Sequence, residues 1–205
     1  MKLRISAVVC VSAMVLAATP ASAHFILVAP DSWIEANVLG DPQKAAPCGT
    51  SAITAGTPTN KITEMRGGDL LHIKIKETIY HPGHYRIALA VKDRAELPAD
   101  PEATTRDGPR GPISVSAKID PAPKPPVLAD GLFAHRERPA ADTFWETDVK
   151  LPNINCDKCT VQIIQFMEEH GLNREGDFTY HHCADLKITA NPAMPIDKGW
   201  PGQGN

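Results

Sequence analysis

The sequence is poor in aromatic residues, which make up 5% of its 205 positions. It also lacks an excess of positive charge, because 21 lysines and arginines stand against 24 aspartates and glutamates. Nucleic-acid-binding proteins usually carry a basic stripe, so we expect no nucleic-acid partner. Beyond residue 23, no apolar run approaches the roughly 20 residues that a membrane-spanning helix requires. We therefore expect no membrane association once the N-terminal segment is removed.

The first 23 residues have the three parts of a secretory signal peptide. Lys2 and Arg4 form a short basic region, and residues 5–18 form an apolar run too short to cross a bilayer. Residues 21–23 read Ala-Ser-Ala, which is an A-x-A cleavage site. Cleavage there predicts a secreted or periplasmic protein whose mature chain begins at His24. We therefore exclude residues 1–23 from the fold.

Four cysteines remain in the mature chain after Cys10 is removed, namely Cys48, Cys156, Cys159 and Cys183. An even number of cysteines in an exported chain favours disulfides over free thiols. A zinc half-site or a redox pair is the alternative for the CxxC motif, but a second CxxC is absent. All three possible pairings stay open. Either Cys48 joins Cys183 and the CxxC closes on itself, or each of these two joins one cysteine of the CxxC.

Short runs with strand character dominate the mature chain, and prolines and glycines separate them. Residues 70–77 alternate between apolar and polar side chains, which is typical of a half-buried strand. Further runs of strand character are 24–30, 84–91, 143–151, 159–166 and 183–189. The sequence contains no convincing long amphipathic helix. We therefore predict an all-β domain over residues 24–190, an antiparallel immunoglobulin/fibronectin-like β-sandwich with long proline-rich loops.

Two segments differ in composition from the rest of the domain. Residues 93–142 are rich in proline and charge, so we expect a long loop insertion with at most one short strand, at 113–119. Residues 191–205 also contain several prolines and glycines. We expect this segment to form an extended C-terminal tail.

The position of His24 directly after the cleavage site suggests metal chemistry. A histidine at a free N-terminus offers one metal ion two nitrogens, the α-amine and the imidazole Nδ1. One further imidazole would complete a T-shaped set of three nitrogens, which suits Cu(II) by ligand type and geometry. Zinc prefers four ligands in a tetrahedron. The alternative is that His24 follows the cleavage site by chance.

The other histidines fall into groups by their surroundings. His72 lies in a strand-like run, where an edge position or a nearby partner would satisfy it. His135 and His170 lie in polar segments, and we expect both to be solvated. Two pairs remain as candidates for the second imidazole, in Tyr-His-Pro-Gly-His-Tyr at 80–85 and in Tyr-His-His-Cys at 180–183.

Five features occur in a fixed order over residues 24–189. They are the histidine after the signal peptide, Cys-Gly at 48–49, the histidine–glycine–aromatic segment at 80–89, the Leu-Pro and paired-cysteine strand at 149–166, and the closing strand at 178–188 with Cys-Ala-Asp. In this combination the chain resembles the lytic polysaccharide monooxygenases and their histidine-brace relatives. The resemblance implies a β-sandwich that binds one copper ion.

Carried over by position, the resemblance implies that His24 binds copper through its amine and imidazole and that His81 supplies the second imidazole. His84 is the alternative, but strand alternation and the position directly before Pro-Gly favour His81. Tyr180 lies three residues before Cys183, where the family keeps an axial tyrosine or phenylalanine. An ordinary core aromatic is the alternative for Tyr180.

The resemblance also implies a glutamine that orients a bound oxygen species, either Gln162 or Gln165. Strand alternation lets at most one of them face the site, and we favour Gln165. Ile163 replaces the family's tryptophan in this strand. His181 and His182 are an addition to the family pattern, and one should face the copper side while the other faces away. The alternative is that one is a surface residue and the other pairs with a carboxylate.

The implied activity is oxidative cleavage of polysaccharide C–H bonds with O2 or peroxide, with electrons from an external donor. The scarcity of aromatic residues and the additional histidines favour a second interpretation, a non-catalytic protein for copper binding or acquisition with the same brace. A structural or adhesive β-sandwich with incidental histidines is the third. Fold alone does not decide among them.

Overall fold

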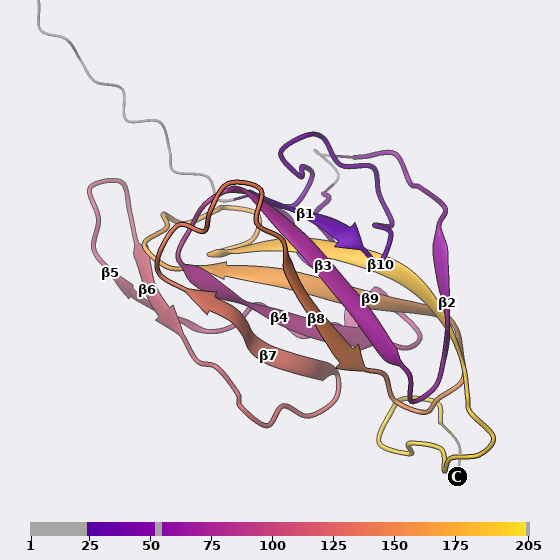
Figure 1. The fold of residues 1–205 in the computed structure, drawn as a ribbon. Helices are drawn as coiled ribbons and strands as arrows, with labels where there is room; N and C mark the ends of the chain where they lie inside the picture. Colours follow the sequence, from indigo (N-terminus) through magenta and orange to yellow (C-terminus); the bar gives the residue numbers. More distant parts are fainter. Residues whose placement is uncertain (1–23, 52–54, 204–205) are drawn as a thin grey trace, which may run out of the picture.

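The computed structural model describes residues 24–51 and 55–203 (Figure 1). The predicted signal peptide lies outside the described residues. Within the described part, no helix is long and apolar enough to cross a membrane.

Two β-sheets make up most of the structure, and their inner faces pack against each other (Figure 1). The smaller sheet is antiparallel and has the strand order β1 (His24–Ala29), β3 (Leu70–Ile79), β8 (Trp145–Lys150). The larger sheet has the order β2 (Ile62–Arg66), β10 (Thr179–Thr189), β9 (Cys156–Met167), β4 (Gly83–Ala90), β7 (Val127–His135). The prediction of an all-β sandwich is confirmed. One strand departs from the antiparallel pattern, because β2 runs parallel to β10.

The core lies between the two sheets and follows from strand alternation. In β3, Leu71, Ile73 and Ile75 are buried, while the residues between them are more exposed. Strand β9 is buried almost throughout, so both faces of the larger sheet are covered at its centre. Its residues Val161 and Ile163 belong to the main core. Since alternate residues of a strand point to opposite faces, Gln165 shares the inner face with them.

The proline-rich segment 93–142 contains more regular structure than predicted, and the expectation of at most one short strand is wrong. It holds a short 3-10 helix (Arg94–Glu96), a hairpin of β5 (Ala103–Arg106) and β6 (Ile113–Ala117), and the edge strand β7. The pairing of β7 with β4 shifts register three times. These irregularities disrupt the alternation that would have indicated a strand. Residues such as Leu128 and Leu132 of β7 nevertheless pack against the core.

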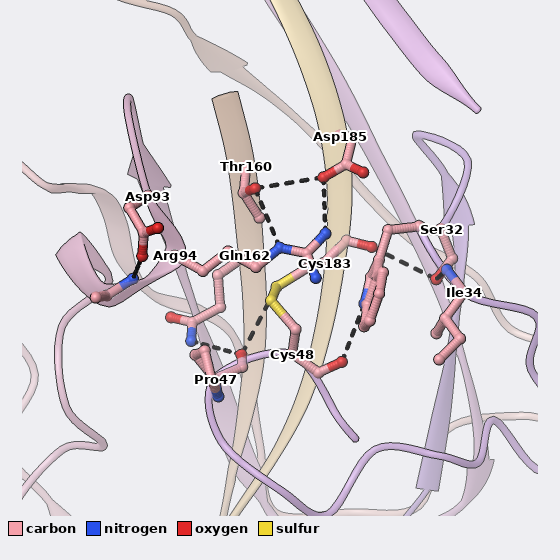
Figure 2. The surroundings of a disulfide bond; sticks show 12 residues. Ser32, Ile34, Pro47, Cys48, Asp93, Arg94, Thr160, Gln162, Cys183 and Asp185 are labelled. Atoms are coloured by element: carbon pink, nitrogen blue, oxygen red, sulfur yellow. Dashed lines mark hydrogen bonds and ion pairs between the residues drawn. A yellow bond between two sulfur atoms is a disulfide. The ribbon is translucent and has the colours of Figure 1, made fainter. Parts of the chain in front are cut away.

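The disulfide bonds follow one of the pairings that the sequence left open, Cys48–Cys183 and Cys156–Cys159. Figure 2 shows the bond between Cys48, in the segment after β1, and Cys183 of β10. Close by, Arg94 forms an ion pair of 2.9 Å with Asp185 of β10. The disulfide attaches the long segment between β1 and β2 to the outer face of the larger sheet, and the ion pair attaches the 3-10 helix after β4 to the same strand.

The C-terminal segment after β10 packs against the sandwich. Trp200 is buried in the main core. The side-chain amide of Asn153 donates hydrogen bonds to the carbonyls of Asn191, Met194 and Pro195. The segment therefore covers the end of the sandwich at which β3 begins (Figure 1).

Candidate metal centre

The two predicted metal-binding histidines lie at the same end of the sandwich. His24 begins β1 and is only 4% exposed. Its Cα partner across the β1–β3 pair is Ile79, the last residue of β3. His81 follows two residues later, in the turn that leads into β4 (Figure 1). The sheet register thus pairs His24 with a residue only two positions before His81, although the two histidines are 57 positions apart in the sequence.

Ring contacts connect these two histidines through two further side chains. The His24 ring stands edge-on to the Tyr180 ring, with centroids 5.2 Å apart. The Tyr180 ring meets the His170 ring at 6.0 Å, and His170 meets His81 at 4.9 Å. We call these four residues the ring cluster. Tyr180, which the resemblance placed beside the metal, therefore lies next to His24.

The burial of His170 contradicts the expectation that this residue is solvated, because it is 5% exposed. The segment after β9 folds back against β6, where the His170 amide donates to the Ser114 hydroxyl and the Ser114 amide donates to the His170 carbonyl. The His170 ring therefore enters the ring cluster instead of pointing into water. Its polar neighbours in the sequence carry no signal for this long-range contact.

The hydrogen bonds of His24 and His81 leave one nitrogen of each ring suited to a metal. The Nε2 of His24 lies 3.3 Å from the Asp41 carboxylate, and this hydrogen bond is the largest cause of a lowered pKa of Asp41. His24 Nδ1 is buried and has no hydrogen-bond partner among the described residues. His81 Nδ1 donates to the Glu168 carbonyl at 3.0 Å, since a carbonyl oxygen can only accept. Its lone pair therefore resides on Nε2.

The protonation state of His81 also suits a metal ligand. Burial lowers the pKa of His81, although the Glu168 carbonyl and the charge of Glu77 oppose this change. A lowered pKa keeps the imidazole neutral near pH 7, which is the form that binds metal. The donor set then consists of His24 Nδ1, His81 Nε2 and, in a chain that begins at His24, the α-amine. These residues fit the nitrogen set that the resemblance implies for copper.

Gln165 faces the inner side of the larger sheet in a row with two tyrosines. It is the Cα partner of both Tyr180 on β10 and Tyr85 on β4. Its amide Nε2 donates to Glu77 at 2.7 Å, while its buried Oε1 has no partner in the described part of the chain. Gln162 points to the opposite face, where it donates to the Pro47 carbonyl beside the disulfide (Figure 2). Of the two candidate glutamines, Gln165 therefore shares the face of Tyr180.

The buried carboxylate of Glu77 accepts hydrogen bonds from two residues of this row. Its side chain is 3% exposed and accepts a hydrogen bond of 3.1 Å from Tyr85 in addition to the one from Gln165. It also lies 3.2 Å from Nε2 of His135, whose side chain is 7% exposed. The expectation that His135 is solvated is therefore wrong. Burial lowers the pKa of His135, but the hydrogen bonds to Glu77 and to the Phe133 carbonyl, together with the charge of Glu77, outweigh burial and the net change is upward.

The remaining histidine candidates have other contacts. His84 packs on Phe166, with ring centroids 5.2 Å apart, on the outer face of the larger sheet. His181 also faces outward and lies 2.8 Å from the Asp100 carboxylate. His182 faces inward and donates from Nε2 to the Phe25 carbonyl at 2.9 Å. One histidine of the pair thus faces inward and the other outward, as predicted. Both are buried, so the alternative of a surface residue is wrong.

No group of three or more histidine, cysteine, aspartate or glutamate side chains is arranged to hold a metal ion within the described residues. A histidine brace is a smaller set, because it needs two imidazoles and one main-chain amine. In comparisons with known proteins, no family model matches the chain, and no curated protein shows significant similarity to it. The function is therefore argued from the geometry of this site.

Proposed function

We propose that the mature protein is a secreted or periplasmic mononuclear copper protein of the histidine-brace type, which acts as a monooxygenase resembling the lytic polysaccharide monooxygenases. The observation that carries the proposal is the buried His24 Nδ1, which lacks a partner in the described chain. His24 is paired with Ile79, two residues before His81, which supports His81 as the second ligand. Burial of an unpaired polar nitrogen is costly, and a bound cation would compensate for it.

Each residue around the site has a distinct part in this proposal. His24 and His81 would hold copper, and the Asp41 carboxylate would keep the proton of His24 on Nε2 so that Nδ1 can bind. Tyr180 would limit access on one side of His24. The chemistry that bound copper supplies is reductive activation of O2 or peroxide for hydrogen abstraction from a glycosidic C–H bond. Gln165 would offer its amide oxygen to the reacting species.

A second function, copper storage or acquisition without turnover, is favoured by one specific observation. The ring cluster contains a third imidazole, that of His170, between Tyr180 and His81. A third imidazole ligand would fill a coordination position that an oxygen-activating site needs to keep open. The two functions therefore differ in whether His170 contributes to the copper signal.

The decisive experiment is EPR spectroscopy of Cu(II)-loaded protein that begins at an authentic His24. We expect an axial, nitrogen-rich signal that is lost in His24→Ala, in His81→Ala and in a variant with one extra N-terminal residue. His72→Ala is the matched control, because His72 is half exposed and pairs with Asp148 on the outer face of the smaller sheet. If the extra residue or His81→Ala leaves the signal unchanged, the brace is wrong.

Activity then separates the two functions. The copper-loaded protein should release oxidised oligosaccharides from a polysaccharide when a reductant and O2 or peroxide are supplied. The EPR signal of the His170→Ala variant should then match that of the unsubstituted protein. If the brace signal is present, His170→Ala changes it and no polysaccharide is oxidised, the copper-holding function is correct and the monooxygenase function is not.

A further inference from the structure

The amide of Gln165 has only one of its two polar atoms satisfied. The residue is 0% exposed. Its Nε2 donates a hydrogen bond of 2.7 Å to Oε1 of Glu77, whereas its own Oε1 has no partner among the described residues. A buried acceptor without a partner costs free energy, which a bound donor would recover. The Oε1 of Gln165 is therefore available to a hydrogen-bond donor that binds nearby.

Two contacts place Gln165 close to His24. Its Cα partner on β10 is Tyr180, whose ring centroid lies 5.2 Å from that of His24. From the facing sheet, Glu77 holds the Gln165 amide, and Glu77 is the Cα partner of Phe25. Phe25 directly follows His24 in β1. Both neighbours of Gln165 therefore connect it to the first candidate copper ligand.

Glu77 determines which atom of the Gln165 amide stays available. A carboxylate accepts hydrogen bonds and donates none, so it can hold only the NH2 end of the amide. Oε1 of Glu77 accepts from both Gln165 and Tyr85, and its Oε2 lies 3.2 Å from Nε2 of His135. A protonated His135 favours the ionised form of Glu77. The amide carbonyl of Gln165 must then point away from Glu77.

We propose that Glu77 is a positioning residue for the candidate copper site, and that it fixes Gln165 so that Oε1 accepts a hydrogen bond from a ligand bound there. The proposal rests on the proposed function. In this orientation the amide favours a ligand that carries a hydrogen, such as water. An amide turned the other way would offer a donor and would favour an anion without hydrogens, such as azide. Glu77 therefore determines which ligands the site prefers.

NMR of the metal-free mature protein tests the orientation, with the side-chain amide of Gln165 identified by its absence in Gln165→Met. We expect its amide protons to exchange slowly with D2O. In Glu77→Gln, residue 77 can donate as well as accept, so the Gln165 amide can turn over. Exchange should then become about tenfold faster, because the hydrogen bond to a charged acceptor is lost. Exchange that is unchanged in Glu77→Gln would overturn the proposal.

Tyr85→Phe is the matched control. It removes the other hydrogen bond to the same oxygen of Glu77 but leaves the carboxylate in place as an acceptor. The Gln165 amide should keep its slow exchange in this variant. Equally fast exchange in Tyr85→Phe and Glu77→Gln would show that any disturbance of these hydrogen bonds releases the amide, which would overturn the proposal. Should Glu77→Gln fail to fold, fast exchange in the unsubstituted protein or in Tyr85→Phe would still overturn it.

Azide binding to the Cu(II)-loaded protein, followed by EPR, tests whether the amide faces the copper site. Glu77→Gln should bind azide more tightly, whereas the loss of a merely structural residue would weaken binding. Removal of the Glu77 charge also favours an anion, so the same substitution is made in Gln165→Met, where no amide can turn. The gain in affinity should be about threefold larger when residue 165 is glutamine. An equal gain in both backgrounds would overturn the proposal.

Failure of the brace itself is recognised separately. In that case the unsubstituted protein gives no nitrogen-rich copper signal, which rejects the proposed function. The exchange measurement uses metal-free protein, so it still shows whether Glu77 orients Gln165.

Discussion

Most histidine side chains of this protein are buried. Six of the eight histidines are buried, so their protonation is tied to folding. Burial is the main cause of the lowered pKa values of His81 and His84. His135 differs because the Glu77 carboxylate raises its pKa. Histidines with a lowered pKa outnumber the one with a raised pKa, and a lowered pKa means that the folded state disfavours the protonated form. We therefore expect mild acid to destabilise the folded state.

His182 should make the largest individual contribution to this sensitivity. Burial lowers its pKa to about 4 from the usual 6.5. Because the folded state disfavours the charged form, the stabilisation is complete above pH 6.5 and decreases as the pH falls toward 4. The loss amounts to roughly 3 kcal/mol. In His182→Gln, the amide can still donate to the Phe25 carbonyl but cannot take up a proton. We expect urea unfolding of this metal-free variant to show a smaller decrease between pH 7 and 4.5.

The control for this measurement is His72→Gln, which replaces an exposed imidazole and should keep the pH dependence of the unsubstituted protein. An unchanged pH dependence in His182→Gln would contradict the assignment of the acid sensitivity to His182.

Individual site residues differ in how far the sequence could reveal them. His24 and His81 could be proposed from the sequence, because the predicted cleavage site marks the first and the resemblance to a known family, together with the Pro-Gly sequence, marks the second. The burial of His170 could not be predicted, because it depends on Ser114, which lies 56 residues away in the sequence. The contact of His135 with Glu77 is likewise a property of the assembled sandwich.

Whether a strand of this fold could be predicted likewise depends on how regular its local sequence is. Strand β3 alternates clearly, and β9 is rich in apolar and β-branched residues from Cys159 onward, so both were predicted from the sequence. Strand β7 was missed, because it follows two prolines and contains Gly131, and because its Phe133 has a positive φ of 52°. These irregularities disturb the period of two on which strand prediction depends. Short β2 was missed as well, since its five residues are all at least partly exposed.

The turn between β3 and β4 positions His81, and Gly83 allows this turn to approach β9. A Cβ atom at Gly83 would lie 1.9 Å from the Phe166 carbonyl oxygen, which belongs to the neighbouring backbone and cannot rotate away. We therefore expect Gly83→Ala to lower the free energy of unfolding by about 3 kcal/mol or more. It should also weaken the proposed copper binding by displacing His81. Thermal unfolding and a copper titration followed by EPR would measure the two effects.

Gly199→Ala is the matched control for this turn, because no atom lies within 4 Å of the added methyl group. It should retain the stability of the unsubstituted protein and the proposed binding of copper. A Gly83→Ala variant that behaves like Gly199→Ala would show that the turn can yield without affecting His81.

Contacts between distant segments hold the whole molecule together. The Cys48–Cys183 disulfide joins residues 135 positions apart, whereas Cys156 and Cys159 are 3 positions apart. The long connection fixes the segment after β1 to β10, so it links the strand that carries His24 to the strand that carries Tyr180. The short disulfide constrains only the start of β9. The two bonds should therefore contribute very differently to global stability.

This difference can be measured by removing each disulfide with a pair of alanine substitutions. Loop-closure entropy attributes about 5 kcal/mol to a loop of this length in Cys48→Ala/Cys183→Ala, against about 2 kcal/mol in Cys156→Ala/Cys159→Ala. Domains of this size are stable by only about 5–15 kcal/mol, so the first variant should be partly unfolded at low urea concentrations while the second stays folded. Equal urea midpoints would show that non-covalent contacts of the segment after β1, such as Arg94 over the Trp33 ring at 3.8 Å, already hold it in place. In that case Tyr180 and His24 would stay together without the disulfide.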